Sequence, residues 1–326
     1  MALGTGGIPA ARLRSRARPA RDAVTPDELN RLFEARVESA SGIRSSGGTD
    51  ADDSRLIARE AIDFMQRSVT DGEPFFVVIW FHSPHMPLVD PEAITPENSA
   101  DALKDGIENL DSAVGMVRQT LRELGVRDNT MVWFTSDNGP ENRVDTPDEA
   151  NPNRSFRTGR LRGRKRSLFE GGIRVPGLLE WPAVVSAPST TSVPCVTSDY
   201  YPTIVDYLGL DLPAQKPLDG VSLRPLIEGR VDRRERPIGF EFAGRAAWVD
   251  NEFKLVRDGR NAPWELFHIS ADSEPALLEA PERALATSEN VDRQPEEWRA
   301  RFAEMLRDFE NWEQAIQPSR DEPGPR

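Results

Sequence analysis

The chain has 326 residues, of which 38% are hydrophobic, so it can bury the core of one large domain or two small ones. Its formal net charge of -13 excludes general binding of nucleic acid by the chain as a whole. A single cysteine, Cys195, excludes an intrachain disulfide framework, and no apolar run approaches the ~18 residues that indicate a membrane span.

The first fifty residues differ from the rest in composition. Five arginines lie between Arg12 and Arg21, before the first acidic residue, and no apolar segment follows them, so we expect no secretory signal here. A capping box at Thr25 with proline at the first helical position predicts a short helix over 25–37, followed by a linker over 39–50. We therefore expect residues 1–50 to form a disordered or atypical extension.

From residue 51 the pattern becomes that of an α/β domain. Apolar residues at helical spacing predict a helix that begins at Ser54, and a second helix over 106–124. Continuous apolar runs predict strands over 74–81, buried on both faces, and over 130–136. The alternation of helix and strand favours a central sheet that is mostly parallel or mixed, within a domain over 51–230.

The last third predicts a small α+β subdomain over 231–316. Before it, residues 200–209 form a short helix that ends at Gly209. The subdomain itself contains a hairpin that turns at Asp250-Asn251, a strand over 264–270 and an amphipathic helix over 295–316. Residues 317–326 read as a disordered tail.

Polar groups follow both predicted strands of the first domain. "HSPHMP" places His82 and His85 in a proline-stiffened loop, and Asp137-Asn138-Gly139 ends the second strand. Ligands gather at the carboxyl ends of strands in open α/β sheets, and adjacent oxygen donors suit Ca²⁺ or Mg²⁺. Taken alone, Asp-Asn-Gly is also an ordinary turn, and loop histidines are commonly surface residues.

A basic stretch supplies the third feature. Seven basic residues and no acid lie between Arg154 and Arg166, which predicts a local positive field that attracts an anion such as sulfate, phosphate or a carboxylate. The alternative is a solvated basic loop. The turn and apolar strand that follow, "LFEGGIRVPGLLEW", favour delivery of this loop to the edge of the sheet.

Together these motifs resemble the sulfatase family, of the arylsulfatase type, within the alkaline-phosphatase superfamily. The matching stretches lie between about residues 50 and 285, and they are "PFFVVIWFHSPHMPL", "DNTMVWFTSDNGPE", "LRGRKRSLFEGGIRVPGLLEWPA", "TSDYYPTIVDYLGLDLPAQKPLDGVSLRPLIEG" and "WELFHISADSEP". The resemblance implies an alkaline-phosphatase-like sandwich and a sulfuric ester hydrolase that acts on aryl or carbohydrate sulfates.

Particular residues take roles from this resemblance. Asp137 and Asn138 correspond to ligands of an active-site Ca²⁺, Lys165 to a lysine that binds a sulfate oxygen, and His85 to a histidine that assists the leaving group. The partner is thus expected to be a sulfated small molecule or glycan. A phosphohydrolase of the same superfamily is disfavoured, because such relatives bring more metal-binding histidines and aspartates than the three histidines here allow.

The chain also departs from the family pattern. It lacks the acidic pair that completes the metal site and the Cys-x-Pro-Ser-Arg motif whose cysteine becomes formylglycine, and Cys195 has neither proline nor arginine at the required offsets, so we expect an ordinary buried or partly buried thiol. The alternative function is therefore a truncated, inactive sulfatase fragment. In that case the runs at 75–81 and 130–136 should expose apolar faces and an unpaired edge, which predicts a poorly soluble or molten chain. Sulfatases are usually exported, but no export signal indicates a compartment here.

Overall fold

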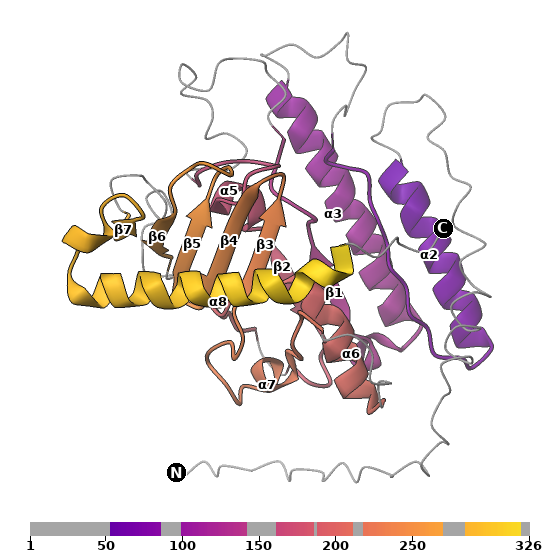
Figure 1. Ribbon diagram of the computed structural model, residues 1–326. Coiled ribbons are helices and arrows are strands. Elements are labelled where there is room, and N and C mark those ends of the chain that lie inside the picture. The colour runs from indigo at the N-terminus through magenta and orange to yellow at the C-terminus, as the bar shows by residue number, and fades with distance from the viewer. Residues whose placement is uncertain are drawn as a thin grey trace, which may run out of the picture.

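A computed structural model describes residues 53–85, 99–141, 161–185, 188–210, 218–269 and 284–320 (Figure 1). The predicted helix at 25–37 and the linker at 39–50 lie outside these ranges. Within them, every helix is too short or too polar to cross a membrane. Mixed helices and sheets confirm the α/β class.

Two long amphipathic helices form one side of the molecule. Helix α2 covers Asp53–Thr70 and α3 covers Ser99–Glu123, and they lie side by side (Figure 1). Their apolar faces meet in a buried cluster of Ala58, Met65, Ala113, Val117 and Leu121. Both helices were predicted, because apolar residues recur every three or four positions.

The segment 73–85 is not the buried strand that its composition predicts. No residue from 73 to 82 is assigned to a strand, although side chains alternate as they do in one. Phe75, Val77, Ile79 and Phe81 pack on the α2–α3 cluster, each partly buried. The side chains between them face outward, and Trp80 is 84% exposed. Because no described strand pairs with this segment, it keeps the period of a strand without a hydrogen-bonded ladder.

The predicted strand at 130–136 forms, but its sheet is not parallel. Strand β1, Val132–Thr135, pairs antiparallel with β2, Gly177–Glu180, and this sheet has two strands among the described residues. Glu180 at the end of β2 accepts hydrogen bonds from Arg118 of α3 and from Arg127. The parallel pairing expected for the central sheet is therefore absent from the part of the chain that the structure describes.

A buried ion pair ties the middle of the chain to its last third. Both terminal guanidinium nitrogens of Arg234 donate to the carboxylate of Asp199, at 2.6 and 2.8 Å, and both side chains are almost fully buried. Asp199 precedes α6, Tyr200–Leu208, which ends as predicted at Gly209 with a left-handed φ of 62°. The short helix α7, Arg224–Ile227, packs beside α6.

The last third is an antiparallel sheet with one covering helix. Five strands follow one another in spatial order, β3 (Ile238–Phe242), β4 (Arg245–Asp250), β5 (Phe253–Arg257), β6 (Glu265–His268) and β7 (Ala286–Thr287). The predicted hairpin turns after Asp250, where Asn251 adopts a positive φ of 52°. Helix α8, Glu296–Arg320, lies across the sheet and runs four residues past the predicted end at 316 (Figure 1).

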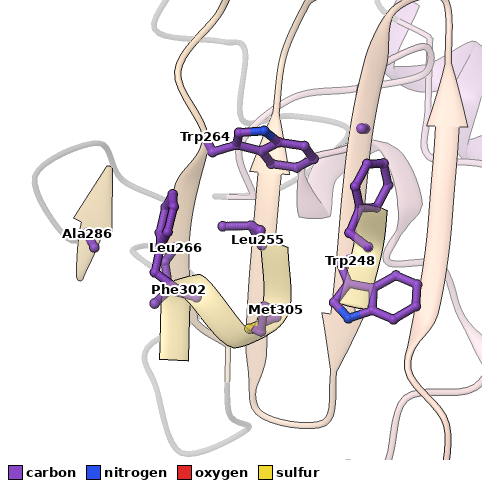
Figure 2. Close-up of a cluster of buried hydrophobic side chains, with 9 residues drawn as sticks. Trp248, Leu255, Trp264, Leu266, Ala286, Phe302 and Met305 are labelled. Atoms are coloured by element: carbon purple, nitrogen blue, oxygen red, sulfur yellow. The ribbon is translucent and has the colours of Figure 1, made fainter. Parts of the chain in front are cut away.

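The two faces of this sheet pack against different parts of the chain. Trp248, Leu255 and Leu266 point toward α8 and pack with Phe302 and Met305 (Figure 2). Alternate residues of the same strands face the other way. Ala247, Val256 and Phe267 pack against Leu168 and Phe169, which belong to the segment that follows the basic stretch. The sheet therefore lies between α8 and that segment.

Candidate functional site

The loop after β1 exposes the predicted metal ligands. Asp137 is exposed, Asn138 is half-buried and Gly139 is buried. The Ser136 hydroxyl donates to the Asn138 carbonyl at 2.9 Å, and the Asn138 amide nitrogen donates to the Gly139 carbonyl at 2.9 Å. Because the amide nitrogen is held inside the loop, the side-chain oxygen of Asn138 is left for an external partner.

Gly139 packs directly on helix α5, Glu170–Ile173. Its N–H donates to the Gly172 carbonyl at 2.8 Å, and a Cβ at position 139 would lie 1.9 Å from the Gly171 carbonyl oxygen. A glycine at a turn ordinarily gives the backbone conformational freedom. The structure gives another reason, since only a residue without a side chain permits this close approach of two backbones.

Lys165 lies on the neighbouring loop. Its N–H donates to the carbonyl of Pro140 at 3.1 Å, so the loop over 161–169 and the loop over 137–141 are joined through their backbones. Gly171 completes the contact, because its N–H donates to the Arg162 carbonyl at 2.6 Å. The structure therefore brings together the loops that carry Asp137, Asn138 and Lys165.

The basic stretch is less available to an anion than its charge count predicted. Arg162 pairs with Glu265 of β6 at 3.2 Å, and its guanidinium carbon lies 3.6 Å from the centre of the Phe169 ring. Arg166, at a positive φ of 73°, pairs with Glu141. By contrast, among the described residues nothing forms a hydrogen bond or ion pair with the ammonium of Lys165. Residues 154–160 lie outside the described ranges.

The histidine pair is positioned by a different segment. His82 and His85 end the segment 73–85, both are exposed, and their ring centroids lie 5.4 Å apart. The His85 N–H donates to the His82 carbonyl at 2.9 Å, which closes a tight turn. The backbone contacts that join the other two loops do not involve this turn, so the meeting of His85 with Lys165 and Asp137 stays a prediction.

The predicted calcium ligands match the ion in type but not in number. Carboxylate and amide oxygens are ligands that Ca²⁺ prefers, yet Ca²⁺ takes about six to eight oxygens. Within the described ranges, no group of three or more histidine, cysteine or acidic residues is placed to hold a metal ion. Asp137 and Asn138 therefore fit one side of a calcium site, and the remaining oxygens must come from elsewhere.

Sequence reasoning missed a buried ion pair behind the site. Lys254 of β5 is fully buried, and its Nζ donates to Glu170 Oε1 at 2.8 Å. Burial alone would raise the pKa of Glu170, but the charge and hydrogen bond of Lys254, helped by Arg174, outweigh burial and lower it. The available signal was a lysine between Phe253 and Leu255, two apolar residues of the same strand.

Cys195 does not have the properties of a nucleophile. It was expected to be buried or partly buried, but it is exposed. Surrounding protein atoms still desolvate the thiol, and this effect together with the negative charge of Asp199 raises the pKa of Cys195 to about 11. Because the thiol stays protonated at neutral pH, it is a poor nucleophile.

Curated relatives support one family. Steryl-sulfatase of Rattus norvegicus is 32% identical over 229 residues, which cover 67% of this chain and 37% of the relative. N-acetylgalactosamine-6-sulfatase of Sus scrofa is 31% identical over 221 residues, covering 67% of this chain and 41% of the relative. The chain thus spans less than half the length of these proteins.

Solved structures show the same arrangement of elements. The chain resembles Ps i-CgsB, with a TM-score of 0.58, 25% identity and coverage of 81% of this chain and 55% of that one. It also resembles the PsFucS1 sulfatase from Pseudoalteromonas sp., with a TM-score of 0.56 at 21% identity, covering 80% of this chain and 53% of that one. These similarities confirm the expected alkaline-phosphatase-like fold.

The family match covers the four residues predicted for the site. The sequence profile described as Sulfatase matches residues 19–210, more than half of the chain. It begins within the predicted N-terminal extension, so part of that stretch belongs to the family region. It includes His85, Asp137, Asn138 and Lys165, the four residues predicted for the site. The chain therefore belongs to the sulfatase family, within the alkaline-phosphatase superfamily.

Proposed function

We propose that this chain carries the anion-binding side of a sulfuric ester hydrolase that acts on aryl or carbohydrate sulfates. Two of the proteins named above are a steryl-sulfatase and an N-acetylgalactosamine-6-sulfatase. One similar solved structure, that of Ps i-CgsB, contains a bound neocarrahexaose. The observation that carries the proposal is the backbone contact between two loops. It joins an exposed carboxylate at Asp137 to a loop whose Lys165 ammonium has no ion-pair partner among the described residues.

The roles of the residues follow from the charge changes in sulfate-ester cleavage. Negative charge builds up on the sulfuryl oxygens, and the ammonium of Lys165 stabilises it there. Negative charge also builds up on the departing oxygen, to which the imidazole of His85 donates a proton. Asp137 and Asn138 would hold a Ca²⁺ ion, which when bound would neutralise further charge on the sulfate group.

A second candidate function is anion binding without hydrolysis. The sequence contains no Cys-x-Pro-Ser-Arg motif, and the pKa of about 11 for Cys195 argues against its only thiol as nucleophile. In that case the two joined loops would retain affinity for sulfate, while no covalent intermediate could form on the chain itself. Binding and turnover therefore separate the two candidates.

Two measurements on the 326-residue chain test these proposals. We expect isothermal titration calorimetry to detect binding of inorganic sulfate, strengthened by Ca²⁺ and weakened at least tenfold in Lys165→Ala. Lys104→Ala, which removes an exposed lysine of α3, is the matched control and should bind as the unmodified chain does. Absence of sulfate binding with and without Ca²⁺ would contradict both candidate functions.

Turnover is measured as release of sulfate from an aryl sulfate ester. Calcium-dependent release that is lost in His85→Ala but retained in His82→Ala supports the hydrolase. Sulfate binding without any release supports the second candidate. Release that is unaffected by His85→Ala would contradict the role proposed for that imidazole.

A further inference from the structure

The buried lysine of β5 lies directly behind the candidate site. Lys254 belongs to the face of the C-terminal sheet that faces away from α8, and α5 lies on that side (Figure 1). Its side chain is 0% exposed and that of Glu170, its partner, is 7% exposed. Removing a lysine and a glutamate from water has a large desolvation cost, so such a pair is uncommon unless it fixes a particular arrangement.

Glu170 begins the helix on which both site loops rest. The two residues that follow it, Gly171 and Gly172, are buried and have backbone neighbours on both sides. A Cβ at Gly171 would lie 2.3 Å from the Gly163 carbonyl oxygen, and a Cβ at Gly172 would lie 2.1 Å from the Ser167 carbonyl oxygen. Any displacement of Glu170 therefore moves backbone that is in contact with both loops.

Apolar packing alone does not fix the position of this helix. Leu168 and Phe169 pack on the sheet through Ala247, Val256 and Phe267, and such contacts are non-directional. The hydrogen bond from Lys254 Nζ to Glu170 Oε1 has a defined length and direction, because donor and acceptor are both charged. It fixes α5 relative to β5 at the residue next to the two glycines.

We propose that Lys254 is a positioning residue for the anion site, acting through Glu170 and α5 on the loops that carry Asp137, Asn138 and Lys165. This proposal rests on the proposed function only in naming what the loops bind. The hydrogen bond of the lysine is made to Glu170, and its effect is to keep the 137–141 and 161–169 backbones in register with each other.

The test compares two buried ion pairs by two readouts. Lys254→Met keeps the aliphatic part of the side chain and removes the ammonium that pairs with Glu170. Arg234→Met removes the guanidinium that pairs with Asp199, and this second pair lies on a different segment. Hydrogen exchange is followed by mass spectrometry in peptides that contain Gly139, Lys165 and Gly171, relative to a peptide of α3. Affinity for inorganic sulfate is measured on the same proteins.

We expect Lys254→Met to raise relative exchange in the loop peptides at least fivefold and to weaken sulfate binding at least tenfold. Arg234→Met should lower the melting temperature without either change. Equal loop exchange in the two variants, or unchanged exchange in Lys254→Met, would overturn the proposal. If the unmodified chain bound no sulfate, the proposed function would fail, but loop exchange would still decide the role of Lys254.

A double variant separates positioning from stability. In Lys254→Met/Glu170→Gln no buried carboxylate lacks its ammonium, so the melting temperature should recover toward that of the unmodified chain. The charged link is still missing, and we expect loop exchange to stay as high as in Lys254→Met. Recovery of loop exchange together with the melting temperature would show that Lys254 acts on stability alone.

Discussion

Replacing Gly139 by alanine should separate the two loops of the candidate site. The new Cβ would lie 1.9 Å from the Gly171 carbonyl oxygen, whereas carbon and oxygen normally approach to about 3.3–3.6 Å. The neighbouring group is backbone and cannot rotate away, so the loop must move by roughly 1.5 Å. That movement also breaks the hydrogen bond from the Gly139 N–H to the Gly172 carbonyl.

The magnitude follows from these two losses. Overpacking costs about 1–3 kcal/mol and a lost backbone hydrogen bond about 0.5–1.5 kcal/mol, so we expect the free energy of unfolding to fall by about 1.5–4.5 kcal/mol. Urea unfolding measures this change directly, provided that the slope with denaturant is the same in both proteins. Sulfate affinity should fall in parallel, because Asn138 is the adjacent residue.

Gly115 is the matched control for this substitution. It lies within α3, and a Cβ there would meet no atom within 4 Å. Gly115→Ala should therefore stabilise the chain by about 0.5–1 kcal/mol, through helix propensity alone. If Gly139→Ala were within about 0.5 kcal/mol of the unmodified chain, or behaved as Gly115→Ala does, the close-approach argument would be refuted.

Further outcomes are expected at Arg234, at Cys195 and at the exposed pair Val78 and Trp80. Arg234→Met should lower the free energy of unfolding by about 3–5 kcal/mol, because it leaves the Asp199 carboxylate buried without its countercharge, and a loss below about 1 kcal/mol in urea unfolding would contradict this. Iodoacetamide should alkylate Cys195 slowly at pH 8 and faster up to about pH 11, the raised pKa of the thiol; a rate that levels off below pH 9 would be inconsistent. The same raised pKa adds stability that is present below the unfolded-state pKa of about 8.5 and is lost as pH rises through 11. The double variant Trp80→Ser/Val78→Thr should self-associate less than the unmodified chain in sedimentation velocity, because both apolar side chains are exposed. An unchanged distribution of sedimentation coefficients would contradict a role of these two side chains in self-association.

Helices were the part of the fold that sequence periodicity predicted well. Helices α2, α3, α6 and α8 depend on their own apolar spacing, so local pattern is sufficient to find them, although α3 begins at Ser99, seven residues before its predicted start at 106. The run over 74–81 is different. Its apolar composition indicates a strand, but a strand needs a partner ladder, and a run of residues carries no information about whether that partner is present.

The candidate site was predicted residue by residue, and its support was not. Asp137, Asn138 and Lys165 were proposed from motifs, and their roles stay a prediction; the structure adds a backbone contact between the loops that carry them. The charge of Arg162 was counted within the basic stretch, but its pairing with Glu265 was not predicted, because it joins positions more than a hundred residues apart. Long-range pairing of this kind depends on register, which composition does not specify.

The alternation along β5 also limits how the turn before it can change. Lys254 and Leu255 are neighbours, yet one points to Glu170 and the other into the core beneath α8. Deleting one residue from the turn at Asn251 would exchange these destinations along the whole strand, setting an ammonium among tryptophans and a leucine against a carboxylate. The length of the turn at this hairpin is therefore constrained by the chemistry on the two faces of β5, although the side chain of Asn251 itself bonds to Arg234 and Asp250.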